Sequence, residues 1–299
     1  MTSLPYVHGY SPRESVRLGD QAQTLADLLH GDERYPAGAH VLEAGCGTGA
    51  QTVILARNNP AVRFVSVDIS PDSLERARTA VTQASLTNVR FKQADVFRLS
   101  FPNAMFDAVF VCFVLEHLAE PVKALEELKR VLRPGGAITV IEGDHGSAYF
   151  YPESDLAKRA IQCLVDLQRH HGGDALIGRR LYPLLRQAGF PEVEVTPRVV
   201  YADASRPEMV EGFTRNTFNA MVEGVGDQAL RAGMMDPASW RQAIADLHLT
   251  AGPDGVFNYT FFKARAVKTQ SLPGHRGRFY HENRNHRLGA PRRGAGPGS

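Results

Sequence analysis

The chain has no apolar stretch of the roughly 18 residues that a membrane helix needs. Its N-terminus lacks the basic start and following apolar run of a secretory signal peptide. Cysteine is scarce: Cys46, Cys112 and Cys163 are far apart, and no Cys-x-x-Cys occurs. A disulfide framework or zinc ribbon is therefore not expected, and the sequence predicts a soluble cytoplasmic protein with reduced thiols.

Most of the chain also has no large excess of either positive or negative charge. The formal net charge is +2, and residues 268–299 carry +6, which leaves −4 on residues 1–267. A nearly neutral, slightly acidic body argues against a nucleic-acid surface. The tail is rich in Gly, Pro, Arg and His and almost free of aliphatic residues, so we expect it to be disordered and solvated. Binding of the tail to a polyanion is the less favoured alternative.

Strand-like and helix-like segments alternate along the first half of the chain. Ser11, Pro12 and Glu14 predict the start of a helix over 11–30. The short connections that follow predict a doubly wound parallel sheet of the α/β class. Strands are expected at 40–43, 63–68, 89–95, 106–113, 137–142, 193–200 and 255–267, with helices at 51–59, 72–84, 121–132, 154–170, 179–189 and within 203–250. The expected division is an N-terminal helical lid (1–35), a cofactor-binding core (36–202), a helical cap (203–252), a final core strand (253–267) and the tail (268–299).

Residues 41–51, VLEAGCGTGAQ, place Gly45, Gly47 and Gly49 in a turn directly after a strand. Such a turn lets a ligand approach the backbone closely. The spacing is not the Gly-x-Gly-x-x-Gly of dinucleotide sites, and no Gly-Lys-Ser/Thr follows as in a triphosphate loop. The sequence therefore indicates a ligand without a pyrophosphate.

Acidic residues at strand ends describe the rest of that ligand. Glu43 can receive a cationic amino group, Asp68 can accept hydrogen bonds from both hydroxyls of a ribose, and Asp95 can take the amine of an adenine. An amino acid, a ribose and an adenine in a row describe S-adenosylmethionine. The alternatives are that Asp68 only caps a helix and that Asp95 is a surface turn residue.

The segments VLEAGCGTG, VSVDIS, QADVF and FDAVFVCFVLEHL…LKRVLRPGGAITVIE resemble the successive motifs of class I S-adenosylmethionine-dependent methyltransferases over about 40–143. The resemblance implies a Rossmann-like, seven-stranded, doubly wound sheet with a helical cap, and S-adenosyl-L-homocysteine as the spent cofactor. It implies that Gly45 and Gly47 admit the methionyl part, that Asp68 binds the ribose, and that Ile69 packs on the adenine. The implied cofactor-binding residues are Glu43, Gly45, Cys46, Gly47, Asp68, Ile69, Asp95, Val96, Cys112 and Phe113, the last two beside the sulfonium.

Several acceptor classes lack their motifs here. Residues 112–115 read CFVL where DNA and glutamine N-methyltransferases have an Asn/Asp-Pro-Pro-Tyr type motif, and no Pro-Cys pair occurs for cytosine methylation. Metal-assisted catechol methylation needs carboxylates after strands four and five, and only Asp144 is available. We therefore expect a small organic acceptor, no metal, no nucleic acid and no membrane partner; a homo-oligomer is left open.

The acceptor pocket is expected between the N-terminal helix, the loop after strand five and the cap. His145 is the best-placed general base, Tyr201 is a second proton acceptor, and His117 is either a base or a packing residue. The residues His170 and His171 are expected in a solvated loop. Aromatic residues suit a planar or isoprenoid acceptor, or else they pack the core of the cap: Tyr6, Tyr10, Tyr149, Phe150, Tyr151, Tyr201 and Phe213.

Three functions follow as hypotheses. C-methylation of a terpenoid or indole-type acceptor in secondary metabolism is favoured, because the overall pattern resembles ubiquinone-type C-methyltransferases and actinomycete natural-product methyltransferases. The alternatives are O- or N-methylation with His145 or Tyr201 as base, and a non-catalytic regulator that binds the cofactor. Arg17 or Tyr10 is expected to close over the methionyl carboxylate.

Overall fold

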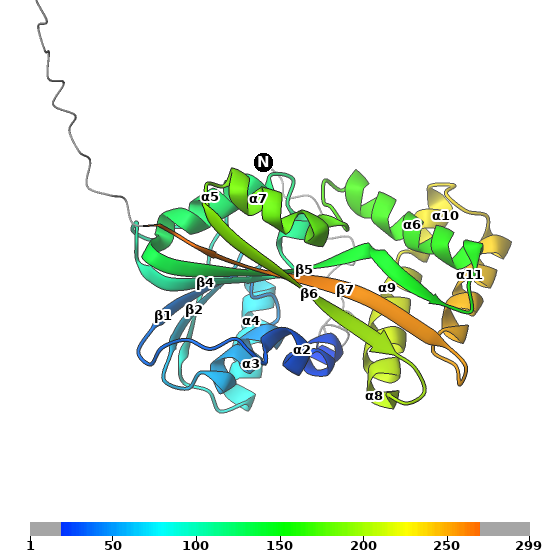
Figure 1. The fold of residues 1–299 in the computed structure, drawn as a ribbon, viewed down its shortest axis with the longest axis horizontal. Coiled ribbons are helices and arrows are strands. Elements are labelled where there is room, and N and C mark those ends of the chain that lie inside the picture. The colour runs from blue at the N-terminus through cyan, green and yellow to red at the C-terminus, as the bar shows by residue number, and fades with distance from the viewer. Residues whose placement is uncertain (1–18, 270–299) are drawn as a thin grey trace, which may run out of the picture.

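The computed structural model describes residues 19–269, which form a seven-stranded sheet between two layers of helices (Figure 1). The strand order is β3-β2-β1-β4-β5-β7-β6, and only β7 runs antiparallel to its neighbours. The predicted doubly wound, Rossmann-like sheet is thereby confirmed. The strands are β1 (His40–Ala44), β2 (Arg63–Asp68), β3 (Val89–Gln93), β4 (Phe106–Cys112), β5 (Leu132–Tyr151), β6 (Glu192–Ala202) and β7 (Val256–Val267).

Helices cover both faces of the sheet because its central strands are apolar on both sides. In β4 every residue except Asp107 is buried, as expected for a central parallel strand. Figure 1 shows α5 and α7 on one face and α2, α3 and α4 on the other. Their bounds are α2 (Ala26–His30), α3 (Ala50–Asn58), α4 (Pro71–Gln83), α5 (Pro121–Val131), α6 (Asp155–His170) and α7 (Leu181–Gln187), with short 3-10 turns η1 (Leu115–His117) and η2 (Ile177–Arg180).

Helices also fill the segment between β6 and β7, within the range expected for the cap. They are α8 (Pro207–Met209), the π-helix η3 (Val210–Asn219), α9 (Ala220–Gly224), α10 (Gly226–Arg231) and α11 (Pro237–Leu249). Their buried side chains join one hydrophobic cluster with those of α2, α6 and β7. The cap therefore shares its core with the face of the sheet that carries α2 and α3.

One element differs from the expectation. Residues 143–151, expected as a loop after strand five, belong to β5 itself, which also includes residues 133–136, expected as a helix end. The reason is β7, which is long enough to pair with both halves of β5, from Ala137 opposite Val267 to Tyr151 opposite Val256. Tyr149, Phe150 and Tyr151 are thus held by pairing with β7, and His145 lies in the irregular stretch of β5 between Asp144 and Tyr149.

The expectations for Tyr6, Tyr10, Arg17, the helix cap at Ser11 and the basic tail lie outside the described residues. Among the helices of residues 19–269, none is both long and apolar enough to cross a bilayer.

Candidate functional site

The glycine turn after β1 leaves open space at one position. Gly45 has φ +73°, and a Cβ there would lie 2.4 Å from Cγ2 of Val114, so this glycine is needed for packing. Gly47 has φ +51°, and a Cβ there would meet no atom within 4 Å. The backbone at Gly47 is therefore open to a ligand in front of the turn. Gly45, in contrast, packs directly against Val114, which follows β4.

Asp68 ties the end of β2 to this turn. Its Oδ2 accepts a hydrogen bond from Gly47 N at 2.8 Å, and its Oδ1 accepts one from Ser70 N at 2.9 Å. Ser70 Oγ in turn accepts from Ser73 N at 3.2 Å and caps α4. Each carboxylate oxygen still has a second lone pair for a ligand hydroxyl. The helix-start role and a ribose-binding role are thus compatible in one side chain.

Glu43 lies beneath the turn rather than in it. It is buried, and its Oε2 accepts hydrogen bonds from Thr52 Oγ1 at 2.7 Å and Ser66 Oγ at 2.6 Å. Burial raises the pKa of Glu43 to about 7, against the hydrogen bonds from the two hydroxyls, which lower it. Its position makes Glu43 a support for β1, β2 and α3.

The expected adenine site is an exposed apolar surface next to Asp68. Ile69 is 51% exposed, and its carbonyl accepts from Gln93 Nε2 at 2.9 Å. Asp95 is exposed and accepts from Phe97 N at 2.9 Å, while Val96 beside it is half-buried. Phe97, which was not among the candidates, is 40% exposed in the same turn. A flat base would find aliphatic and aromatic surface there together with a carboxylate.

The turn that directly follows β4, residues 113–115, is called here the β4 exit. It is shaped by Glu142, a residue that the sequence did not single out. Glu142 is fully buried, and its Oε1 accepts hydrogen bonds from Val114 N at 3.0 Å and Leu115 N at 2.7 Å. Phe113, just before this turn, has φ +57° and donates from its N to Ile141 O at 2.9 Å. Burial, together with the charge of Glu116, raises the pKa of Glu142 well above its usual range. The only sequence signal for this role was an acid at the end of an apolar strand.

The two cysteines expected at the cofactor site, Cys46 and Cys112, are both buried. Burial raises the pKa of each thiol above its ordinary value. Both therefore remain protonated at neutral pH and act as small apolar side chains.

His145 is buried at the far end of the site. Its Nδ1 lies 2.7 Å from Oη of Tyr259 on β7, and its ring packs edge-on to Phe218 at 6.0 Å. The other candidate, His117, ends the short turn η1 and lies 3.6 Å from Oε1 of Glu116. Tyr259, the partner of His145, comes 114 residues later in the chain and was not foreseen.

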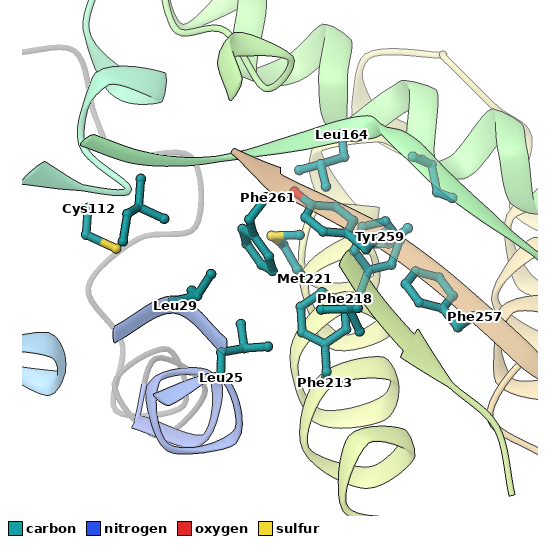
Figure 2. Close-up of a cluster of buried hydrophobic side chains, with 14 of the residues drawn as sticks. Leu25, Leu29, Cys112, Leu164, Phe213, Phe218, Met221, Phe257, Tyr259 and Phe261 are labelled. Atoms are coloured by element: carbon teal, nitrogen blue, oxygen red, sulfur yellow. The ribbon is translucent and has the colours of Figure 1, made fainter. Parts of the chain in front are cut away.

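The aromatic candidates are divided between the two faces of the sheet. Phe150 and Phe213 are buried in the cap core, where Phe150 stacks on Phe257 at 6.2 Å. Tyr149 and Tyr151 are 66% and 60% exposed on the opposite face, because successive strand residues alternate. Figure 2 shows the buried cluster, in which side chains from β7 meet those of the π-helix: Phe213, Phe218, Phe257, Tyr259 and Phe261.

Tyr201 lies on the exposed face as well, opposite Asn258 of β7 in the same row as Tyr149. Its hydrogen bond to Asp203, and the charge of that carboxylate, raise the pKa of Tyr201 above its ordinary value. A tyrosine acts as a base through its ionised form, which these contacts disfavour. Since Tyr201 lies on the exposed face and His145 is buried, the structure does not bring these two residues together.

Residues 19–269 contain no cluster of histidine, cysteine or acidic side chains that would hold a metal ion. Asp144, the one carboxylate expected after strand five, pairs instead with Arg179. His170 and His171 lie at the end of α6 and bond to the carbonyls of Asp166 and Leu167.

Comparison with known proteins bears directly on this arrangement. Residues 42–140 match the family model described as a methyltransferase domain. An uncharacterised 37.1 kDa protein of a Streptomyces fradiae transposon is 33% identical over 72% of this chain and 59% of its own length. The demethylmenaquinone methyltransferase of Thermus thermophilus is 39% identical over 34% of this chain and 46% of its own length. The chain thus spans less than two thirds of either relative.

Among solved structures, phosphoethanolamine N-methyltransferase 2 of Haemonchus contortus, in complex with S-adenosylhomocysteine, superposes with a TM-score of 0.54. It is 19% identical and the match covers 83% of this chain and 53% of that one, so it supports the fold. The matched residues 42–140 contain the glycine turn, Asp68 and the β4 exit. This chain therefore carries a domain of the class I S-adenosylmethionine-dependent methyltransferases.

Proposed function

We propose that the protein transfers a methyl group from S-adenosylmethionine to a small acceptor with a hydroxylated aromatic ring, and that His145 removes the hydroxyl proton. The observation that carries this proposal is a row of aromatic contacts. It leads from the turn after β4, at the cofactor end of the site, to His145 at the acceptor end. Phe113 at the β4 exit contacts Phe261 at 5.4 Å, Phe261 contacts Tyr259 at 4.7 Å, and Tyr259 bonds to His145. The aromatic side chains of Phe113, Phe261 and Tyr259 thus link the cofactor end of the site to the buried base, His145.

The residues at the carboxyl ends of β1 and β2 fit the cofactor. The open space at Gly47 admits the methionyl part, Asp68 keeps lone pairs for the ribose, and Ile69 offers an exposed apolar face to the adenine. The cofactor supplies a methyl group on a sulfonium, which is already activated for displacement. The chain's own task is to align the acceptor and to accept its proton.

A ring hydroxyl suits both the base and its apolar surroundings. Proton transfer to His145 would leave negative charge shared between the oxygen and the adjacent ring carbons, so either O- or C-methylation follows from the same first step. The aromatic side chains around His145 would exclude water from that anion. The similarity to a demethylmenaquinone methyltransferase supports a quinone-type ring. An alkene or indole acceptor would not require His145, which separates it from this proposal.

The test is transfer of labelled methyl groups from S-adenosylmethionine to a panel of acceptors: naphthohydroquinones with and without a prenyl chain, an indole and an isoprenoid alkene. For a hydroquinone, His145→Gln should lower kcat about 10²–10⁴-fold, the usual contribution of a general base. Cofactor affinity, measured by calorimetry, should not change. Tyr201→Phe and His170→Ala are matched controls that should retain activity.

Transfer to indole or alkene at a rate unaffected by His145→Gln would contradict the proposal and support base-free C-methylation. Tight cofactor binding without transfer to any acceptor would support a non-catalytic regulator instead.

A further inference from the structure

The element that packs against His145 from the cap is a π-helix, η3 (Val210–Asn219). π-helices are rare, and those that occur are frequently at functional sites. Their backbone hydrogen bonds join residues five apart, so residue i+5 comes to lie over residue i. A side chain adds a bond of the same span: Thr217 Oγ1 donates to Gly212 O, five residues earlier, at 2.7 Å.

The π-helical turn brings Phe213 and Phe218 to the same side of η3. With about 3.6 residues per turn, an α-helix would direct side chains five positions apart about 140° away from each other. Here both rings are buried against β7. Phe213 lies 5.4 Å from Tyr259 and 6.1 Å from Phe257, and Phe218 lies 5.5 Å and 4.8 Å from the same two rings. Figure 2 shows the two side chains among the rings of β7.

The two phenylalanines meet different parts of the site. Phe213 lies 5.7 Å from Phe261, whose ring contacts Phe113 at the β4 exit. Phe218 instead lies 6.0 Å from His145, with 79° between the two ring planes. Phe213 thus belongs to the cofactor end, and Phe218 occupies the space beside the base.

The position of His145 is fixed by a bulge in β5. Between Asp144 and Tyr149, four residues of β5 (145–148) lie opposite the single residue Tyr259 of β7. A bulge re-aims side chains and is frequent beside active sites. Within it, His145 N donates to Ala175 O at 3.0 Å, and Nδ1 lies 2.7 Å from Oη of Tyr259. Moving the imidazole aside for a larger acceptor would break both contacts.

The helix that carries Phe218 is fixed as well. At Gly212, a Cβ would lie 2.1 Å from Oγ1 of Thr24 and 3.0 Å from its Cβ, so η3 already touches the segment before α2. At the other end, Asn219 Nδ2 donates to Leu247 O of α11 at 3.0 Å. The distance between the Phe218 ring and the base is therefore set from both sides.

We infer that Phe218 is a specificity-determining residue, which limits the size of the group on the ring carbon next to the hydroxyl that reaches His145. The inference rests on the proposed function, in which that hydroxyl lies at the base. Two rings in edge-on contact at 6.0 Å between their centres leave no space for a further group between them. The acceptor class is thus a phenol or hydroquinone that carries only hydrogen beside the reacting hydroxyl.

The test is binding of two naphthols to the full chain in complex with S-adenosylhomocysteine, measured by naphthol fluorescence. 1-Naphthol carries hydrogen beside its only hydroxyl, and 2-isopropyl-1-naphthol carries a branched group there. The wild type should bind 1-naphthol at least tenfold more tightly. In Phe218→Ala the ratio of the two affinities should fall about tenfold or more, because a hydrophobic pocket distinguishes even one methylene by roughly 10–200-fold.

Phe257→Leu is the matched control. Phe257 is buried in the same cluster, and its ring contacts Phe150, Phe213 and Phe218. This variant loosens the cluster without opening the space beside His145, so the ratio should stay as in the wild type. Phe218→Leu removes the ring with a smaller loss of buried volume, and it takes the place of Phe218→Ala if that variant does not bind S-adenosylhomocysteine.

An unchanged ratio in the Phe218 variants, an equal change in Phe257→Leu, or equal affinities of the wild type for both naphthols would overturn the inference. The proposed function is tested separately, by methyl transfer in His145→Gln. If the ratio falls as expected but His145→Gln transfers methyl groups as fast as the wild type, the base is rejected and Phe218 is kept as the residue that limits acceptor size. A wild type that binds neither naphthol would reject both.

Discussion

The backbone N–H of Gly47 donates a hydrogen bond to Oδ2 of Asp68 at 2.8 Å. This contact joins the turn after β1 to the end of β2, two neighbouring parallel strands. A carboxylate in this place both shapes the turn and faces the space in front of it.

Replacement of Asp68 by alanine should weaken binding of S-adenosylmethionine about 100-fold, which corresponds to about 3 kcal/mol and to the loss of charge-assisted hydrogen bonds to the ribose. Isothermal calorimetry with S-adenosylmethionine and S-adenosylhomocysteine measures this, and NAD should not bind. Asp72→Ala, an exposed carboxylate in the first turn of α4, is the control and should bind like the wild type. Equal affinities of the two variants would remove Asp68 from the cofactor site.

Gly47→Ala separates ligand exclusion from backbone strain. The added methyl group would meet no protein atom within 4 Å but would enter the space in front of the turn, at φ +51°. The strain should cost about 1–2 kcal/mol, whereas cofactor affinity should fall at least tenfold. Gly38→Ala is a matched control, because Gly38 has φ +78°, equally open surroundings and a position before β1. It should lose similar stability in urea unfolding and keep its affinity; a parallel loss of affinity would show that strain alone is responsible.

Glu43 should make the protein less stable as the pH rises. Its pKa is about 7 in the folded state and lies near 4.5 when the chain is unfolded, so the folded state binds more protons between these values. The free energy of unfolding should therefore fall through this window, by about 3 kcal/mol in total. In Glu43→Gln, whose amide oxygen can still accept from Thr52 and Ser66, this contribution should vanish. Urea unfolding at pH 5, 6, 7 and 8 compares the two slopes, and identical slopes would exclude a buried titrating Glu43.

Lys263 should be essential for stability because it pairs with an acid that is almost entirely shielded from water. Its Nζ lies 2.7 Å from Glu33 and 2.7 Å from Asp32, and the side chains of Lys263 and Glu33 are nearly buried. Lys263→Met should cost about 3–5 kcal/mol in urea unfolding, since it leaves the Glu33 charge uncompensated.

Addition of Glu33→Gln to Lys263→Met should restore most of that loss. Lys158→Met breaks an exposed pair with Glu153 and should change stability by less than about 1 kcal/mol. A double variant as unstable as Lys263→Met would show that packing, not charge, explains the loss.

The sequence determined the element order and the close approach of Gly47 to Asp68, because both follow from where the strands end. β2 begins and ends where predicted, at Arg63 and Asp68. The carboxyl ends of parallel strands meet at one edge of a sheet, so residues that follow β1 and β2 must lie close together. Gly47 and Asp68 could therefore be placed side by side from their positions in the sequence.

The acceptor end was decided by the tertiary structure. Which of Tyr149 and Phe150 faces the cap depends on the register of β5 against β7, and that register shifts at a bulge no local pattern announces. Tyr259, Glu142 and Lys263 acquire their roles from contacts across the sheet, with strands and loops distant in sequence. An antiparallel strand that returns after the whole cap brings Tyr259 to His145, 114 residues away. Local periodicity can specify a strand, but only the packed sheet specifies its neighbour, its register and the side chains that meet across it.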